Sequence, residues 1–201
     1  AIAGSPLAFT AYTAAQQTAT AYTSAVGLAT VTFAVGQASG VYQYRAAFAP
    51  ADTYEQRWGS ATFTVNPRPT VLTAGARELY TYETFLASAT LRDGRTGGYV
   101  SGKTVTFTYK GITRTATTGL TGTASYLIDA GSVAAAAYEL TAAFAPDAAY
   151  AGFTASSTIR VNHRPVTIAG QTVTTYSNSD FISSATLTDA HVTSATVALA
   201  N

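Results

Sequence analysis

The chain has 201 residues, a net charge of +1 at pH 7 and no cysteine, and only 10% of its residues are charged. A nucleic-acid-binding protein needs a basic surface to displace counterions from phosphates, so this charge argues against DNA and RNA as partners. The lack of cysteine excludes disulfides and thiolate chemistry. Hydrophobic residues make up 47% of the chain and aromatic residues 11%, which is enough to build a folded core.

The sequence repeats itself at a spacing of 96 residues. The pentapeptide AAFAP occurs at 46–50 and at 142–146, and the related VNPRP and VNHRP occur at 65–69 and 161–165. A repeat of this length is the size of a whole domain rather than of a solenoid turn. The expected organisation is a partial repeat, a complete repeat and a second partial repeat, over residues 1–69, 70–165 and 166–201.

The first repeat lacks the opening strands of the unit and begins near a predicted strand at residues 8–13. In the middle repeat, apolar and polar residues alternate in short segments, which is the period of half-buried strands. The seven strands predicted there cover residues 71–74, 85–91, 103–109, 112–117, 124–128, 138–144 and 158–161. The last repeat holds only the first three strands, and the third, at residues 194–199, can pair with the region around Lys103. No segment shows a convincing helical pattern, so the chain is predicted to be all-β.

Seven alternating strands in about 100 residues are typical of an immunoglobulin-like (Ig-like) β-sandwich. The predicted fold is a tandem array of such repeats, in which Val105, Phe107, Leu140 and Phe144 face between the two layers. Tyr138 opens the sixth predicted strand, where these sandwiches carry a tyrosine corner. The prolines of the two junctions restrict the backbone, so we expect short, stiff links between consecutive domains.

Several short blocks follow one another in a consistent order. They are GKTVTFT at 102–108, TATTGLTGTA at 115–124, YELTAAFAPDAAY at 138–150 and the closing VNxRP. Together they resemble the bacterial Ig-like repeat domains of large cell-surface proteins, over the whole middle repeat and parts of the other two. The resemblance implies a sandwich in the tandem stalk of an adhesin, surface-layer or fibre protein, with no catalytic residues. Many such repeats carry Gly-Asp before the tyrosine, whereas this chain has Pro146-Asp147, so no ion-binding role is transferred to Asp147.

Residues 97–104, GGYVSGKT, match the phosphate-binding pattern G-x-x-x-x-G-K-[ST]. That pattern binds phosphate because the N-terminus of a helix follows the glycine-rich loop. Here Lys103 is followed by TVTFTY, a predicted strand. We therefore interpret the segment as a loop between strands and predict neither a nucleotide site nor an enzyme.

The residues that could hold a metal ion are few and scattered. His163 and His191 are the only histidines, far apart in the sequence, and His163 takes the place of Pro67 in the second junction. This predicts no zinc site. The aspartates are spread singly, so a calcium site would arise only where loops converge at an interdomain joint. A Lys103–Asn162 isopeptide is a further possibility, but the first repeat contains no lysine. We expect no metal and no cofactor.

Trp58 is the only tryptophan and lies in the turn or the approach to the last strand of the first repeat. The preferred interpretation is that it packs in the protein, since single large apolar residues usually do. The alternative is an exposed aromatic ring that contacts a sugar or a neighbouring subunit.

The composition, poor in lysine and rich in threonine and serine, favours an exported protein, and no apolar run is long enough to span a membrane. Methionine is absent even at position 1, so we expect a processed product or a piece of a longer protein. The partial repeats of 69 and 36 residues together come close to one repeat. The simpler interpretation is a window of a longer tandem array. The alternative is that the tail of one subunit is completed by the head of the next, as in a filament.

The predicted function is that of a structural repeat module of an extracellular, cell-surface protein, acting as a stalk or as a fibre subunit. The expected partners are neighbouring copies or adjacent repeats, arranged end to end. The second candidate is an adhesive module that binds a glycan or a protein through Trp58 and the tyrosine-rich loops.

Overall fold

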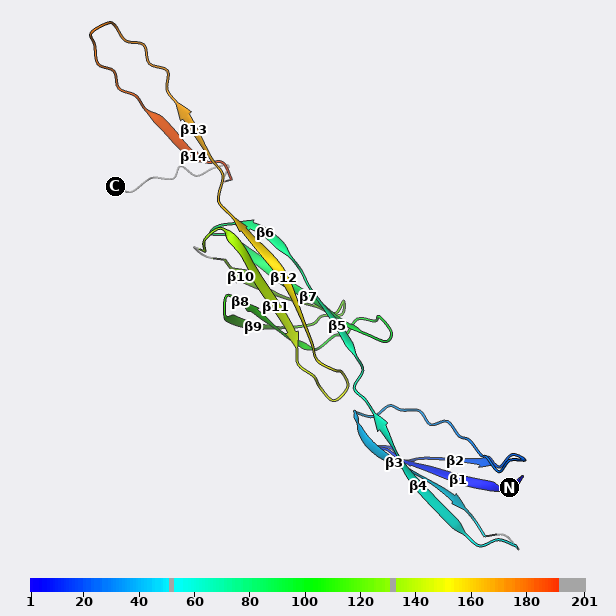
Figure 1. Ribbon diagram of the computed structural model, residues 1–201. Helices are drawn as coiled ribbons and strands as arrows, with labels where there is room; N and C mark the ends of the chain where they lie inside the picture. The colour runs from blue at the N-terminus through cyan, green and yellow to red at the C-terminus, as the bar shows by residue number, and fades with distance from the viewer. Residues whose placement is uncertain (51–52, 131–132, 192–201) are drawn as a thin grey trace. The chain divides into compact units, whose positions relative to one another are not determined.

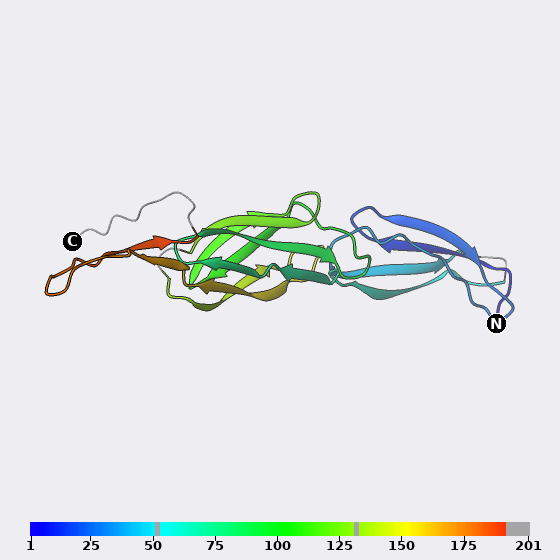
Figure 2. The same ribbon diagram turned by 90° about the horizontal axis from the view of Figure 1, so that it is seen from above.

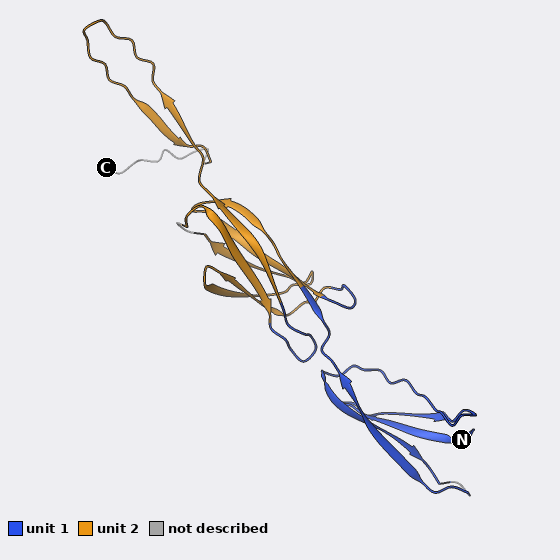
Figure 3. Ribbon diagram, viewed as in Figure 1, with its two compact units in different colours: residues 1–71, 93–98, 145–153 blue, residues 72–92, 99–144, 154–201 orange. Residues whose placement is uncertain are grey.

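The computed structural model describes residues 1–50, 53–130 and 133–191, and within them it contains strands and no helix (Figure 1). No helix among these residues is therefore long and apolar enough to cross a membrane. Two compact units are present (Figure 3). Unit 1 comprises residues 1–71, 93–98 and 145–153, and unit 2 comprises residues 72–92, 99–144 and 154–201.

Unit 1 contains one antiparallel sheet of four strands in the order β2-β1-β3-β4. The strands are β1 (Pro6–Tyr12), β2 (Gln17–Tyr22), β3 (Gly40–Phe48) and β4 (Arg57–Val65). Residues 28–33 run without a strand partner and alternate between half-buried and exposed positions. Among the described residues of these four strands, Ala11 is the one hydrophobic side chain that is fully buried.

Eight strands, β5 to β12, form a two-layer sandwich whose core lies in unit 2. One sheet has the order β10-β7-β5 and the other has the order β6-β12-β11-β8-β9. The strands are β5 (Thr70–Ala74), β6 (Arg77–Tyr80), β7 (Thr84–Asp93), β8 (Thr104–Tyr109), β9 (Ile112–Thr117), β10 (Thr123–Asp129), β11 (Ala136–Phe144) and β12 (Phe153–Asn162). This arrangement is an Ig-like β-sandwich, as the sequence predicts.

The core of the sandwich is made by alternate residues of both sheets. Val105, Phe107 and Leu140 are completely inaccessible to solvent, and Phe144 is 5% exposed. The opposite sheet contributes side chains such as Leu91, which is also inaccessible. The predicted inward face is therefore confirmed, and each large side chain buried there contributes about 1.5–3 kcal/mol.

Two details of the sandwich differ from the prediction. Strand β6 is an eighth strand that the sequence pattern does not reveal, because it forms by parallel pairing with β12 rather than by its own alternation. Strand β12 begins at Phe153, five positions before the predicted start at 158. The strand predicted at residues 194–199 lies outside the described residues.

The last two strands, β13 (Val166–Gly170) and β14 (Ala185–Asp189), form a separate antiparallel hairpin (Figures 1 and 2). No third strand joins this sheet in the portion of the chain that the structure describes. Its apolar side chains are open to solvent: Ile168 is 72% exposed and Leu187 is 51% exposed.

The strands of unit 1 repeat those of the sandwich, but not at one uniform spacing. Strand β3 lies 96 positions before β11, as predicted. Strand β1 is offset by 98, because Leu7 pairs with Phe48 as Val105 pairs with Phe144. The hairpin connection from Ala11 to Gln17 is three residues longer than that from Tyr109 to Ile112, so the offset is 95 at β2. The repeat length of about 96 residues therefore holds, with local offsets of 95 and 98 positions in this stretch.

The tyrosines that open equivalent strands make the same hydrogen bond. The hydroxyl of Tyr138 donates to the carbonyl oxygen of Ala134 at 2.8 Å, and that of Tyr42 donates to the carbonyl oxygen of Ala38 at 2.9 Å. Each bond reaches back four residues. This is the backward contact of a tyrosine corner, and it ties the loop before the strand to the sheet.

Candidate functional site

Two features of the structure can support a function: a linker contact that occurs twice, and an open sheet face in unit 1. The open face consists of the side chains of β1, β3 and β4 that occupy inward positions. Their counterparts in the sandwich form the core. The residues of the open face are Leu7, Phe9, Ala11, Tyr44, Ala46, Phe48, Phe63 and Val65.

The open face is only partly covered. Tyr44 is 37% exposed, whereas its counterpart Leu140 is inaccessible. The hollows on this face include one of about 340 Å³ beside residues 29–37 and one of about 640 Å³ beside Leu7 and Phe48. Well-packed protein interiors leave few such voids, so this face has the character of half a core.

The first linker contact holds the segment VNPRP within unit 1. The guanidinium of Arg68 forms an ion pair with the carboxylate of Asp93, with 2.6 Å between Nη2 and Oδ2. The backbone of Arg68 exchanges two hydrogen bonds of 2.8 Å with the loop at Ala149 and Ala151. The N–H of Gly94 donates to the carbonyl oxygen of Pro69 at 2.8 Å. The linker is thus bonded through backbone and side chain alike.

The electrostatics of Asp93 favour its charged form. Burial of the carboxyl would raise its pKa, since the side chain is only 4% exposed. The backbone N–H groups of Arg95 and Thr96 donate to Oδ1, and the positive charge of Arg68 lies beside Oδ2. These interactions outweigh the burial and lower the pKa of Asp93 below its ordinary value.

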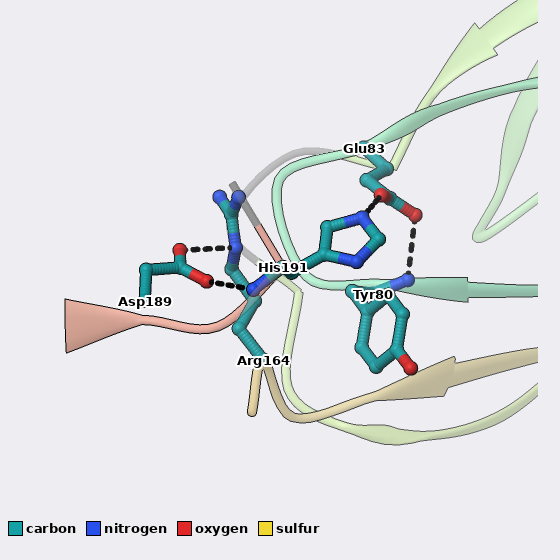
Figure 4. Close-up of polar contacts among 5 residues, drawn as sticks. All are labelled: Tyr80, Glu83, Arg164, Asp189 and His191. Atoms are coloured by element: carbon teal, nitrogen blue, oxygen red, sulfur yellow. Dashed lines mark hydrogen bonds and ion pairs between the residues drawn. The ribbon is translucent and has the colours of Figure 1, made fainter. Parts of the chain in front are cut away.

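The second linker contact repeats the first, 96 positions further along the chain (Figure 4). Arg164 forms an ion pair with Asp189, with 2.9 Å between Nε and Oδ2. The N–H of Ala190 donates to the carbonyl oxygen of Pro165 at 2.9 Å, as Gly94 does to Pro69. Oδ1 of Asp189 accepts from the N–H of His191, as Oδ1 of Asp93 accepts from Arg95. Four features of the contact therefore recur. They are the arginine, the aspartate, the proline carbonyl that accepts a hydrogen bond, and the turn whose N–H donates to Oδ1 of the aspartate.

Beside the second contact, His191 at the end of the hairpin also contacts the sandwich. Nε2 of His191 lies 2.5 Å from Oε1 of Glu83 (Figure 4). The centre of the imidazole ring lies 4.4 Å from the centre of the Tyr80 ring. The backbone N–H of Tyr80 donates to the carboxylate of Glu83, and this bond lowers the pKa of Glu83. Partial burial opposes the shift, whereas His191 and Arg164 add to it. An imidazolium at His191 would complete an ion pair with this carboxylate.

Sequence reasoning missed these linker contacts. The signal was present, because both the arginine and the aspartate recur at 96 positions. The fold brings Arg68 and Asp93 together although 25 positions separate them in the chain. Pattern analysis of either segment alone could not show the pairing.

The structure assigns plain roles to several residues that the sequence singled out. Lys103 is followed by strand β8 and not by a helix, so the phosphate-binding pattern lacks its anion site. His163 is an exposed linker residue. The carboxylate of Asp147 accepts hydrogen bonds from the N–H groups of Ala149 and Tyr150, which shapes its own loop. The side-chain amide of Asn162 donates to Glu78 at 2.9 Å.

Residues 1–50, 53–130 and 133–191 contain no group of three or more His, Cys, Asp or Glu placed to hold an ion.

Trp58 is not packed, and the packing interpretation is wrong. It lies in β4 opposite Ala47 and is 63% exposed. The guanidinium of Arg45 stands 4.7 Å from the centre of its ring. Both side chains lie on the outer side of the sheet, because Tyr44 and Ala46 point to the open face. This pair makes an aromatic and cationic patch on the outer side of unit 1.

No protein-family model matches the chain, and no match was found among curated proteins. Solved structures that match the chain include a tetra-tandem repeat in the extending region of a large adhesion protein, at 19% identity and a TM-score of 0.44. That match covers 86% of this chain and 46% of the other, so this chain spans less than half of that structure. Fibronectin(III)-like modules of Clostridium thermocellum CbhA match at 17% identity and a TM-score of 0.37, over 80% of each chain. The S-layer protein SbsC matches at 10% identity and a TM-score of 0.31, over 88% of this chain and 33% of that one.

Proposed function

We propose that this chain is a structural repeat module of an extracellular, cell-surface protein, acting as a stalk or fibre segment. The observation that carries the proposal is the linker contact, which recurs with the same arginine, aspartate and proline at both junctions. A spacer that transmits position or load needs joints that do not swing freely. An ion pair restrains the linker at each junction, with three backbone hydrogen bonds at the first and the bond from Ala190 to Pro165 at the second. No catalytic step is part of this function.

In this proposal residues 70–165 form one complete domain, and residues 1–69 and 166–201 form partial domains. The two partial domains hold complementary portions of one sandwich. The first supplies the sheet that corresponds to β9-β8-β11-β12, and the second supplies the hairpin that corresponds to β5 and β7. Head-to-tail strand complementation follows, in which the hairpin of one subunit or repeat completes the open face of another.

The test is the assembly state of the purified chain. Sedimentation velocity over a range of concentrations, followed by negative-stain electron microscopy, should show end-to-end oligomers that lengthen as concentration rises. A chain that stays monomeric at high concentration would refute complementation between subunits.

A second function is favoured by the patch of Arg45 and Trp58. An exposed tryptophan beside a cation suits the face of a sugar ring or a protein loop. Binding to a panel of immobilised glycans should be lost in Trp58→Ala and kept in Tyr22→Ala, which removes another exposed aromatic ring. Equal binding by both variants would remove this candidate.

A further inference from the structure

We infer the register in which a second copy of this chain completes unit 1: residues 181–186 of the second copy pair antiparallel with residues 28–33, with Ser184 opposite Thr30. The inference rests on the proposed function and makes it specific. The complete sandwich provides the template, because its strand β7 pairs with β10 in a defined register, in which Ser88 lies opposite Ser125.

The segment at residues 28–33 is the counterpart of β10. In the sandwich the N–H of Gly122 donates to Gly119, and that of Gly119 donates to Thr123. In unit 1 the N–H of Gly27 donates to Ser24, and that of Ser24 donates to Leu28. Gly27 and Gly122 also share a positive φ, of 77° and 68°. The same turn therefore precedes both segments at an offset of 95 positions.

The side chains of this segment show the same alternation as β10. Ala29, Val31 and Phe33 are half-buried and line the hollow of about 340 Å³, whereas Thr30 points outward and is exposed. Strand β10 has its ladder with β7, but residues 28–33 have no ladder in the described chain. Beyond Leu28, which is bonded to Ser24, residues 29–33 thus present an extended edge whose backbone groups have no partner among the described residues, and such an edge accepts an added strand.

The donor strand is the counterpart of β7 at an offset of 96 positions. Phe181 and Leu187 correspond to Phe85 and Leu91. Phe181 is 62% exposed and Leu187 is 51% exposed, whereas Phe85 is 6% exposed and Leu91 is inaccessible. In strand β13, Ile168 is 72% exposed and its counterpart Leu72 is 3% exposed. The hairpin thus carries apolar side chains that are exposed to solvent, whereas their counterparts in the complete sandwich are buried.

Transfer of the template register gives the contacts across the new interface. Ser184 lies opposite Thr30, and both point outward. Phe181 lies opposite Phe33, and both point into the hollow beside the open face. One buried polar atom at this hollow, Nε2 of Gln37, has no hydrogen-bond partner in the described chain, so an added strand also supplies possible acceptors.

We assign the donor to a second copy because the base of the hairpin is held at the sandwich that precedes it in the chain. Nε2 of His191 lies 2.5 Å from Oε1 of Glu83, and Arg164 pairs with Asp189 beside it. A second copy can receive the hairpin while these contacts stay in place. The completed domain would then begin with one linker contact and end with the other, as the middle domain does.

The test uses the lack of cysteine in the chain. Two full-length single variants, Ser184→Cys and Thr30→Cys, are mixed and oxidised. The yield of disulfide-linked heterodimer is measured on a non-reducing gel. Both positions are exposed, so folding should be unaffected. Control mixtures combine Ser184→Cys with Val31→Cys, which points to the other face, or with Leu28→Cys, which is displaced by two residues.

We expect the Thr30 mixture to give at least several-fold more heterodimer than either control. Assembly seen in the microscope together with a stronger Leu28 or Val31 linkage would overturn the register and leave the proposed function intact. Absence of both assembly and linkage would overturn both. A double variant, Thr30→Cys with Ser184→Cys, should link between chains. Fast disulfide formation within one monomer at high dilution would show that the hairpin pairs with residues 28–33 of its own chain. It would overturn the inference that the donor is a second copy.

Discussion

Replacing Leu187 by alanine should weaken self-association about 30-fold, which corresponds to about 2 kcal/mol. The side chain is 51% exposed in the hairpin, and its counterpart Leu91 is inaccessible in the complete sandwich. Covering the exposed half accounts for about 1 kcal/mol, since full burial of a leucine contributes about 1.5–3 kcal/mol. The void left by truncation adds a further cost, because Leu→Ala changes in packed sites cost about 2–5 kcal/mol.

The assay is sedimentation equilibrium of the full chain and the variant over the same concentration range. Thr188→Ala is the control, because its side chain points to the other face of the same strand and its counterpart Arg92 stays exposed in the sandwich. The thermal transition of the sandwich at low concentration should match that of the parent, since Leu187 lies in the separate two-stranded hairpin and not in the core of the sandwich.

Equal association constants for the parent and Leu187→Ala would refute the reasoning. They would mean that the apolar face of the hairpin stays uncovered in the assembly. A loss of association in Thr188→Ala that matches the loss in Leu187→Ala would point to general disruption of the hairpin.

Three further predictions concern the rest of the chain. Gly122→Ala should lower the stability of the sandwich by about 2 kcal/mol or more, because φ at this position is +68° and the added Cβ would lie 2.5 Å from the carbonyl oxygen of Leu91; an unchanged denaturation midpoint would contradict this geometry. Asp93 has a lowered pKa in the folded chain, so its stabilising effect is present above its ordinary pKa of about 3.9 and is lost as pH falls through the lowered value. Urea titrations from pH 7 to pH 2 should therefore show that the stability of Asp93→Asn depends less on acid than that of the parent. Parallel curves of stability against pH for the two proteins would rule out this role. Acrylamide should quench the fluorescence of Trp58 efficiently, since the ring is 63% exposed, and a protected emission would show that the outer side of the sheet is covered.

The strands of the sandwich were predictable because they alternate apolar and polar residues over a buried face. Lys103 to Tyr109 and the β11 region follow this pattern, and the structure has strands at both places. Strand β6 was not predictable in the same way, because RELY joins the sheet through its partner β12. Local sequence carries no record of that tertiary pairing.

The side on which Trp58 lies could not be read from sequence either. Residues 57–62 of β4 are all exposed, so the usual contrast between an inner and an outer face is missing at this end of the strand. The linker contacts depend on pairs distant in the chain, and only the recurrence of both members at 96 positions could have suggested them. The local departure from 96 positions could not be predicted, because the additional residues lie inside a hairpin loop, where they disturb no ladder.

The parallel pairing of β6 with β12 has a mechanical consequence. It joins a strand near the start of the sandwich to the strand that ends it, through residues such as Leu79 and Val161. When the two ends are pulled apart, parallel terminal strands must slide past one another, so their hydrogen bonds share the load. Antiparallel neighbours pulled from the same edge would instead lose their hydrogen bonds in succession. Resistance to extension is set by the rate of unfolding rather than by equilibrium stability, and this geometry should slow that rate when the two terminal strands are pulled apart.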